Sequence, residues 1–298
     1  MQYQSIIRIL EYCGIDCIAL DVAKAKKILA AEFSIAPGGI ISIDGFDYTQ
    51  NDVFNELECD DFASRLPTHL WIWKTPSLLN CLEKNEANIK ELQWLNTTHF
   101  NDKSYRQAIR VISPYFAVSF NKIMHKLLNE AQFTVAEDWI QTLRFVDNAE
   151  DEYTALSSTR IFINDFIRLL RNSNERSYKS NLPQLNKWFS QPWYNFTNQL
   201  PESLDSTVND LLLMMNNFTV AIYSTNKRLC RKISKQLIQV ENIDSDSKKA
   251  ITENHEAFKP LIYIFFEGLK GYRISGWEYF FLGWIILKII GYIFKSCS

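Results

Sequence analysis

Hydrophobic residues recur every three or four positions through most of the chain, which is the spacing that places them on one face of a helix. Clear examples run from Leu78 to Leu95 and from Leu156 to Leu170. Helix start signals occur at Asp21, an expected N-cap, at Thr75-Pro76, with proline at the first helical position, and at Thr134 to Glu137, a capping box. The pattern predicts a mainly α chain, folded as an irregular multi-helix array or bundle.

A short β-hairpin is expected near the N-terminus, at about residues 40–49. Two apolar segments, Ile40–Ile43 and Phe46–Thr49, flank the pair Asp44-Gly45. An Asp-Gly pair readily supplies the positive φ values of a type I′ turn, so the pattern predicts a hairpin with a two-residue loop. Because a lone hairpin is marginal in water, it is expected to pack against neighbouring helices.

Proline and polar stretches indicate where helices end. Pro114 is expected to interrupt the helix that begins at Asp102, because proline removes a backbone hydrogen bond. The stretch 172–180 is the most loop-like and predicts a long connection. The predicted regions are an N-terminal helical region with the hairpin (1–172), a second helical region (181–258) and an apolar C-terminal segment (259–298).

The segment from Pro260 to Phe294 is apolar and rich in aromatic residues. Its longest apolar part, Tyr279 to Phe294, is shorter than the roughly 20 residues that a span needs, and Lys288 lies near its middle. Three interpretations stay open: an apolar helix buried in the core, a membrane span, or a helix lying in the membrane interface. The two membrane interpretations together are favoured. They predict bilayer contact through Trp277, Phe281, Leu282, Trp284, Ile286, Ile290 and Ile293.

A basic face is expected on the helix that precedes this segment. It consists of Lys227, Arg228, Arg231, Lys232 and Lys235. Anionic headgroups attract such a face, at about 1 kcal/mol per basic residue near the surface. The alternative is an ordinary solvated helix surface, and the nearby apolar segment favours the membrane interpretation. Nucleic-acid binding is not expected, because the net charge is −2 and no nucleic-acid-binding module is recognisable.

Composition agrees with a folded cytoplasmic protein. Hydrophobic residues make up 47% and charged residues 22% of the 298 positions, which excludes wholesale disorder. The 9 glycines and 8 prolines are too few for a turn-rich β fold and favour long helices. Six cysteines do not form a disulfide framework in a chain of this length, and the N-terminus lacks a basic secretory start, so reduced thiols in a cytosol are predicted.

No catalytic, cofactor-binding or metal-ligating residue is predicted. The four histidines are His69, His99, His125 and His255, and none belongs to a zinc motif. Cys13 and Cys17 would share a helix face, but no second pair accompanies them. The acidic run from Glu56 to Asp61 lacks the second acidic motif that a divalent-metal site on facing helices would need.

These features favour a non-enzymatic helical adaptor or scaffold. It is expected to bind an unidentified partner protein and to attach through its C-terminus to the cytoplasmic face of a membrane. The ring-rich segment from Trp188 to Phe196 is expected to pack in the core, with partner anchoring as the alternative. Two other functions stay open: a membrane-acting effector with a helical sensing body, and an all-α enzyme with a metal-dependent site.

Overall fold

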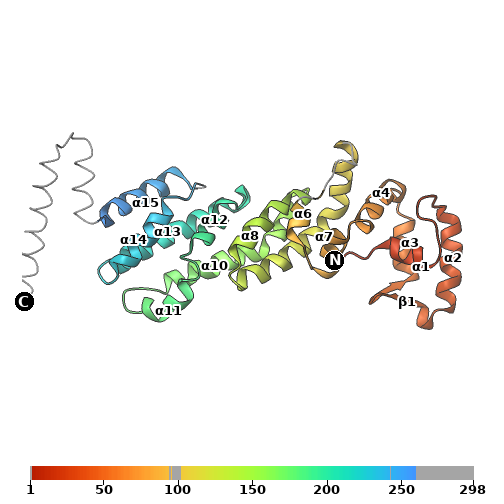
Figure 1. Ribbon diagram of the computed structural model, residues 1–298, viewed down its shortest axis with the longest axis horizontal. Helices are drawn as coiled ribbons and strands as arrows, with labels where there is room; N and C mark the ends of the chain where they lie inside the picture. The colour runs from red at the N-terminus through yellow and green to blue at the C-terminus, as the bar shows by residue number, and fades with distance from the viewer. Residues whose placement is uncertain (1, 94, 96–101, 242, 260–298) are drawn as a thin grey trace, which may run out of the picture.

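Helices follow one another along an elongated array. The computed structural model describes residues 2–93, 95, 102–241 and 243–259. Within these residues the chain forms fifteen α-helices and one two-stranded hairpin. Figure 1 shows the N-terminal elements at one end of the array and the last described helices at the other. The predicted mainly α fold with an N-terminal hairpin is therefore confirmed, whereas the predicted apolar C-terminal helix lies outside the described residues.

The elements fall into three groups along the array. The first group is α1 (Ile6–Tyr12), α2 (Val22–Ile35), the 3-10 helix η1 (Pro37–Gly39), β1 (Ile40–Ile43), β2 (Phe46–Thr49), α3 (Gln50–Leu57) and α4 (Phe62–Trp73). The second is α5 (Pro76–Lys84), α6 (Ile89–Gln93), α7 (Asp102–Asn129), α8 (Phe133–Ile140), η2 (Gln141–Phe145), α9 (Ala149–Ala155) and α10 (Ser157–Arg171). The third is α11 (Tyr178–Leu185), α12 (Gln191–Asn198), η3 (Glu202–Leu204), α13 (Asp205–Ile222), α14 (Lys227–Leu237) and α15 (Ser245–Phe258).

The hairpin turn and two helix starts, which depend on residues adjacent in the sequence, form as predicted. β1 pairs antiparallel with β2, and the turn residues Asp44 and Gly45 have φ values of 51° and 81°. Both positive values are those that a type I′ turn requires. The side chain of Asp21 accepts a hydrogen bond from the Lys24 backbone N–H, and Pro76 is the first residue of α5. Local chemistry alone therefore accounts for these boundaries.

Two expected helix boundaries are wrong. The helix α7 continues through Pro114 instead of stopping there. Ile112 and Phe116, on either side of this proline, are fully buried, so packing along the helix outweighs the lost hydrogen bond. The helix α8 begins at Phe133, so Thr134 lies inside it and is not its cap. Phe133 is itself buried, and the helix begins two residues earlier than a cap at Thr134 would allow.

Buried side chains form two hydrophobic clusters within the described part of the chain. The smaller cluster joins α1, α2, α3, the hairpin and the start of α4, whereas the larger one runs through the central and C-terminal helices. The larger cluster is built around rings: Trp188 stacks on Phe162 and Phe166 at centroid distances of 4.0 and 4.1 Å. Trp193 is fully buried beside them. The rings between Trp188 and Phe196 therefore pack in the core.

The helices α13, α14 and α15 pack against one another at the far end of the array (Figure 1). The helix α14 turns Cys230, Ile233 and Leu237 inward, and all three are buried. This inward face fixes which side of α14 is exposed to solvent. Across residues 2–93, 95, 102–241 and 243–259, we find no helix with the length and apolar character needed to cross a bilayer.

Candidate functional site

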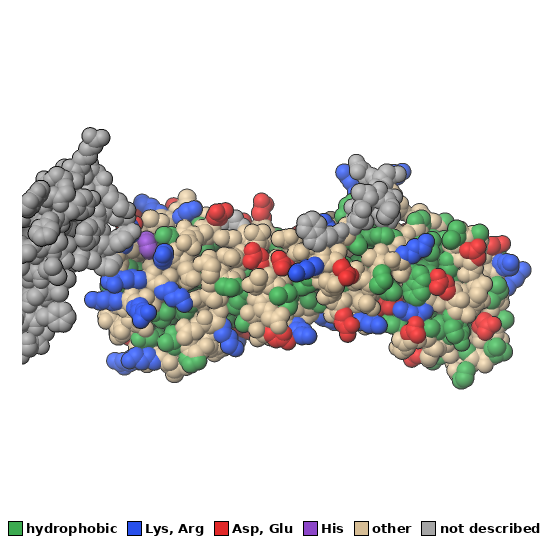
Figure 2. All heavy atoms as spheres, in the orientation of Figure 1, with side chains coloured by type: hydrophobic (Ala, Val, Ile, Leu, Met, Phe, Trp, Pro, Cys, Tyr) green, Lys and Arg blue, Asp and Glu red, His purple; other side chains and the backbone are tan. Residues whose placement is uncertain are grey.

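The five predicted basic residues lie together on the outer face of α14. The exposed members are Lys227, Arg228, Lys232 and Lys235, and Arg231 is half-buried. They face outward because Cys230, Ile233 and Leu237 occupy the opposite side of the helix. Figure 2 shows Lys and Arg side chains gathered over this end of the array. The structure thus presents one continuous basic face, as the helical spacing predicts.

The start of α14 is fixed by local contacts. The side-chain oxygen of Asn226 accepts a hydrogen bond from the Leu229 backbone N–H at 3.1 Å and caps the helix. The ammonium group of Lys227 lies 5.7 Å from the centroid of the Tyr223 ring, at the end of α13. No acidic residue occupies the first turn of α14. The helix therefore begins with two exposed cations, Lys227 and Arg228.

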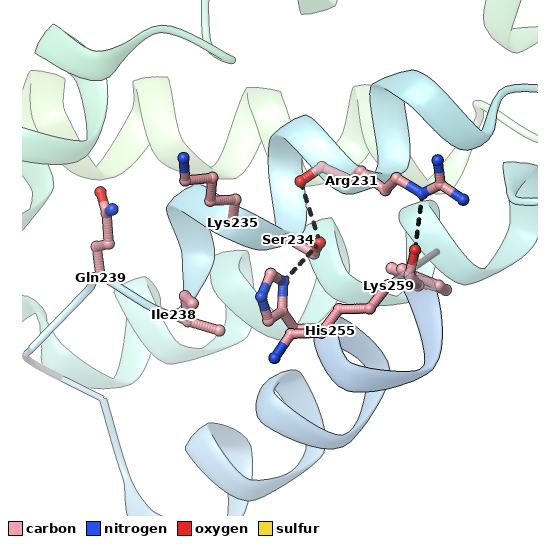
Figure 3. A pocket seen from close by; sticks show the side chains of 8 residues that line it. Arg231, Ser234, Lys235, Ile238, Gln239, His255 and Lys259 are labelled. Carbon is pink, nitrogen blue, oxygen red and sulfur yellow. Dashed lines mark hydrogen bonds between the residues drawn. The ribbon is translucent and has the colours of Figure 1, made fainter. Parts of the chain in front are cut away.

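A pocket of about 380 Å³ opens between α14 and α15, beside the basic face (Figure 3). Its polar lining consists of Arg231, Ser234, Lys235, Gln239, His255 and Lys259, and its apolar lining of Ile238 and Phe258. The Nε–H of Arg231 donates to the backbone oxygen of Phe258 at 2.7 Å, which joins the two helices. The Ser234 hydroxyl lies 3.1 Å from Nδ1 of His255. The pocket is therefore lined by both basic and apolar side chains.

Positive charge is in excess around this pocket. Arg231, Lys235 and Lys259 line it, and the nearby carboxylate of Glu256 lies 2.7 Å from the Lys259 ammonium. Burial lowers the pKa of His255, the positive charges of Lys259 and Lys235 lower it further, and Glu256 acts in the opposite direction. His255 is therefore mainly neutral near pH 7, and among the described residues three cations line the pocket and one carboxylate lies nearby.

A buried ion pair near the N-terminus was missed by the sequence analysis. The Arg8 guanidinium binds the Glu83 carboxylate through two hydrogen bonds, of 2.8 and 2.6 Å, and the two side chains are 7% and 1% exposed. Glu83 also accepts the backbone N–H of Ser5, and the hydroxyl of Tyr48 accepts from Arg8. One signal was present, since Arg8 stands within an apolar cluster, Ile6 to Leu10, and a buried arginine requires a partner.

A second cluster of polar residues contains Tyr3, His69 and Glu56. It lines a pocket of about 450 Å³ between the N-terminal segment, α3 and α4. The Tyr3 hydroxyl lies 3.0 Å from Nδ1 of His69, whose Nε2 lies 3.3 Å from Glu56. Glu56 also pairs with Arg65 at 3.0 Å. His69 and Arg65 lower the pKa of Glu56, and burial raises that of Tyr3. Tyr3 is therefore a neutral buried phenol. We assign a structural role to the series of contacts that runs from Tyr3 through His69 and Glu56 to Arg65.

The acidic run from Glu56 to Asp61 is engaged by basic side chains. Glu56 and Asp61 both pair with Arg65, and Glu58 pairs with Lys26. Among the residues that the structure describes, no group of three or more His, Cys, Asp or Glu side chains is arranged to hold a metal ion. These carboxylates therefore contribute to ion pairs in the N-terminal part of the array.

The remaining predicted contacts fall outside the described residues. These are Trp277, Phe281, Leu282, Trp284, Ile286, Ile290 and Ile293, and their assignment to a bilayer stays a prediction. Comparisons with protein-family models, with curated proteins and with solved structures gave no match to this chain. The functional interpretation therefore depends on the physical character of the α14 and α15 end of the array.

Proposed function

We propose that this chain is a non-enzymatic helical adaptor or scaffold that docks on the anionic, cytoplasmic face of a membrane through α14. The observation that carries the proposal is the basic face itself, with five cations on one side of one helix. Each basic residue near an anionic surface contributes about 1 kcal/mol of attraction. A face of this size is enough for reversible recruitment to a membrane.

The position of the cations on the helix supports a binding role. The N-terminal end of a helix dipole is positive, so a cation in the first turn costs roughly 0.3–1 kcal/mol at an exposed site. Lys227 and Arg228 occupy the first two positions of α14, where helix stability favours Asp or Glu. Their positive charges therefore reduce the stability of the helix, and attraction to an anionic surface gives them a favourable role.

The route of the chain supports the same orientation. Lys259, the last described residue, lines the pocket beside the basic face, and the apolar sequence from Pro260 to Phe294 follows directly. Stable attachment to a membrane generally takes two signals, such as an apolar group together with a basic patch. In this proposal the basic face supplies one signal and the apolar segment supplies the other.

The proposed adaptor role rests on exposed apolar side chains at the N-terminal end of the array. Tyr12, Ile35 and Ile40 are 62%, 77% and 41% exposed, and all three line one surface pocket there. Exposed apolar side chains that lie close together are typical of surfaces that bind other proteins. We therefore propose that a partner protein binds the N-terminal end while the C-terminal end contacts the membrane.

The membrane proposal predicts that removing charge from α14 weakens binding to anionic vesicles. The double variant Lys227→Gln, Lys232→Gln is expected to bind vesicles of phosphatidylcholine and phosphatidylserine at least tenfold more weakly than the unchanged protein, because two attractions of about 1 kcal/mol are lost. Co-sedimentation with these vesicles measures the affinity. Vesicles of phosphatidylcholine alone are expected to bind poorly throughout.

The matched control is the double variant Lys24→Gln, Lys27→Gln, which changes two exposed lysines at the other end of the array. It has the same net charge as the α14 variant, so it is expected to bind anionic vesicles almost as the unchanged protein does. Equal losses in the two variants would show that overall charge acts, not the α14 face. Equal binding to neutral and anionic vesicles would contradict the electrostatic proposal.

A further inference from the structure

We propose that the pocket between α14 and α15 is a binding site for a phosphate monoester. This inference rests on the proposed membrane function and deepens it, because it separates one specific ligand from the general attraction of the basic face. The pocket volume of about 380 Å³ lies within the usual range for small-molecule sites, about 300–1,000 Å³. The phosphate would lie against the basic side chains of the lining, and its organic part against Ile238 and Phe258.

Two of the cations that line the pocket come from α14. Arg231 and Lys235 are four residues apart, so their side chains are neighbours on α14. The hydrogen bond from Arg231 Nε to the Phe258 carbonyl positions the guanidinium group across the junction with α15 (Figure 3). A guanidinium group with one N–H held in this way presents its other donors as a planar fork that suits phosphate oxygens.

The charge of the pocket indicates which anion it favours. Three cations line it, Arg231, Lys235 and Lys259, and the carboxylate of Glu256 offsets one of them. A phosphate monoester carries close to two negative charges at pH 7, because its second pKa is about 6. A phosphodiester or a carboxylate carries one. The pocket therefore complements a monoester dianion better than it complements a phosphodiester headgroup such as that of phosphatidylserine.

Protonation of His255 would supply a further donor, at Nε2. The Ser234 hydroxyl is within hydrogen-bond distance of the Arg231 carbonyl, at 3.3 Å, and of His255 Nδ1, at 3.1 Å. When the hydroxyl donates to the carbonyl, its oxygen accepts the Nδ1 proton, and Nε2 of His255 is the atom that can gain a proton. In Figure 3, one imidazole nitrogen of His255 points toward Ser234, and the other nitrogen points away from Ser234.

Binding of a dianion is therefore expected to favour protonation of His255. Burial, Lys259 and Lys235 hold the pKa of His255 below its usual value, and Glu256 opposes them; Arg231 lines the same pocket. A nearby dianion stabilises the imidazolium form, so complex formation takes up a proton. We expect the affinity for the phosphate monoester to rise severalfold as the pH falls from about 8 to about 6.5. This pH range lies above the second pKa of the phosphate, so the ligand stays mainly dianionic. His255→Gln is expected to remove this rise, and an unchanged pH profile in that variant would exclude His255 from the site.

The test compares two lysines of the same exposed helix, Lys235 in the pocket and Lys232 outside it. The full-length variants Lys235→Gln and Lys232→Gln carry the same charge, and matching circular dichroism spectra and melting temperatures establish that both are folded. Each is bound to vesicles containing phosphatidylserine, and to vesicles of equal surface charge containing phosphatidic acid, a phosphate monoester. Calorimetric titration of the soluble ester glycerol 3-phosphate separates a lipid source of the ligand from a soluble one.

We expect Lys232→Gln to weaken binding to both vesicles equally. Lys235→Gln is expected to weaken binding to phosphatidic acid vesicles about tenfold more than binding to phosphatidylserine vesicles. Binding of glycerol 3-phosphate that Lys235→Gln abolishes would also support the site and would identify a soluble ester as a ligand. Equal effects of the two variants on both vesicles, without binding of the soluble ester, would overturn the pocket proposal and leave the basic face standing. Failure of the unchanged protein to bind phosphatidylserine vesicles would instead count against the proposed function.

Discussion

Replacing Glu83 by alanine is expected to destabilise the protein by about 3–5 kcal/mol, because the buried Arg8 guanidinium loses its two-hydrogen-bond partner and keeps only the exposed carboxylate of Asp44, 3.5 Å from its Nε. The pair is almost wholly shielded from water, with Arg8 7% and Glu83 1% exposed. Burying a charge without a closely hydrogen-bonded partner is among the costliest changes that a core can undergo. Urea unfolding followed by circular dichroism measures the loss as a fall in the free energy of unfolding.

The pair also joins elements that are far apart in the sequence. Arg8 lies on α1 and Glu83 on α5, 75 positions away, and Tyr48 of the hairpin contacts Arg8 as well. The matched control is Glu86→Ala, an exposed glutamate three positions further on, with an expected change within about 0.5 kcal/mol. Similar losses for Glu83→Ala and Glu86→Ala would contradict the assignment of this ion pair as a major contact.

Replacing Trp193 by alanine is expected to cost about 3–5 kcal/mol, as large-to-small changes of buried tryptophans do. The ring is fully buried, and its centroid lies 5.1 Å from that of Trp188 and 5.2 Å from that of Phe133. The cavity left by the variant would open between α8 and α12, so the loss should appear as a lower melting temperature and a lower urea midpoint.

The indole nitrogen of Trp193 makes a second variant informative. It is buried and has no hydrogen-bond partner within the described structure. Trp193→Phe removes this unpaired donor and keeps most of the ring volume, so its expected cost is below about 1.5 kcal/mol. Ile161→Ala, at an exposed position of α10, is the surface control with a change near zero. A Trp193→Phe variant as unstable as Trp193→Ala would show that the indole nitrogen has a stabilising role that the structure does not reveal.

The sequence predicts those parts of the fold that depend on neighbouring residues. The Asp44-Gly45 turn and the Asp21 cap are decided within a few positions, and both form as expected. The continuation of α7 through Pro114 is decided by packing against distant helices, so the local proline signal gave the wrong boundary. The partnership of Arg8 with Glu83 is decided in the same way: the apolar residues around Arg8 indicate that it is buried, but they do not indicate its partner.

The same distinction applies to the candidate site, which consists of the basic face and the pocket. The basic face could be predicted because Lys227, Arg231 and Lys235 follow helical spacing, which the sequence alone displays. The pocket could not, because it depends on α15 folding back against α14, with His255 close to Ser234. In the sequence alone, His255 has the pattern of an ordinary structural histidine.

The most direct test of the proposed docking surface is lysine footprinting on the full-length protein, read by mass spectrometry. Acetylation of exposed amines is compared with and without vesicles of phosphatidylcholine and phosphatidylserine. The proposal predicts that Lys227, Lys232 and Lys235 become markedly less reactive on anionic vesicles, whereas Lys24 and Lys27 at the other end of the array keep their reactivity. Unchanged reactivity of the three α14 lysines on vesicles that bind the protein would contradict it, because the membrane would then be contacting another surface.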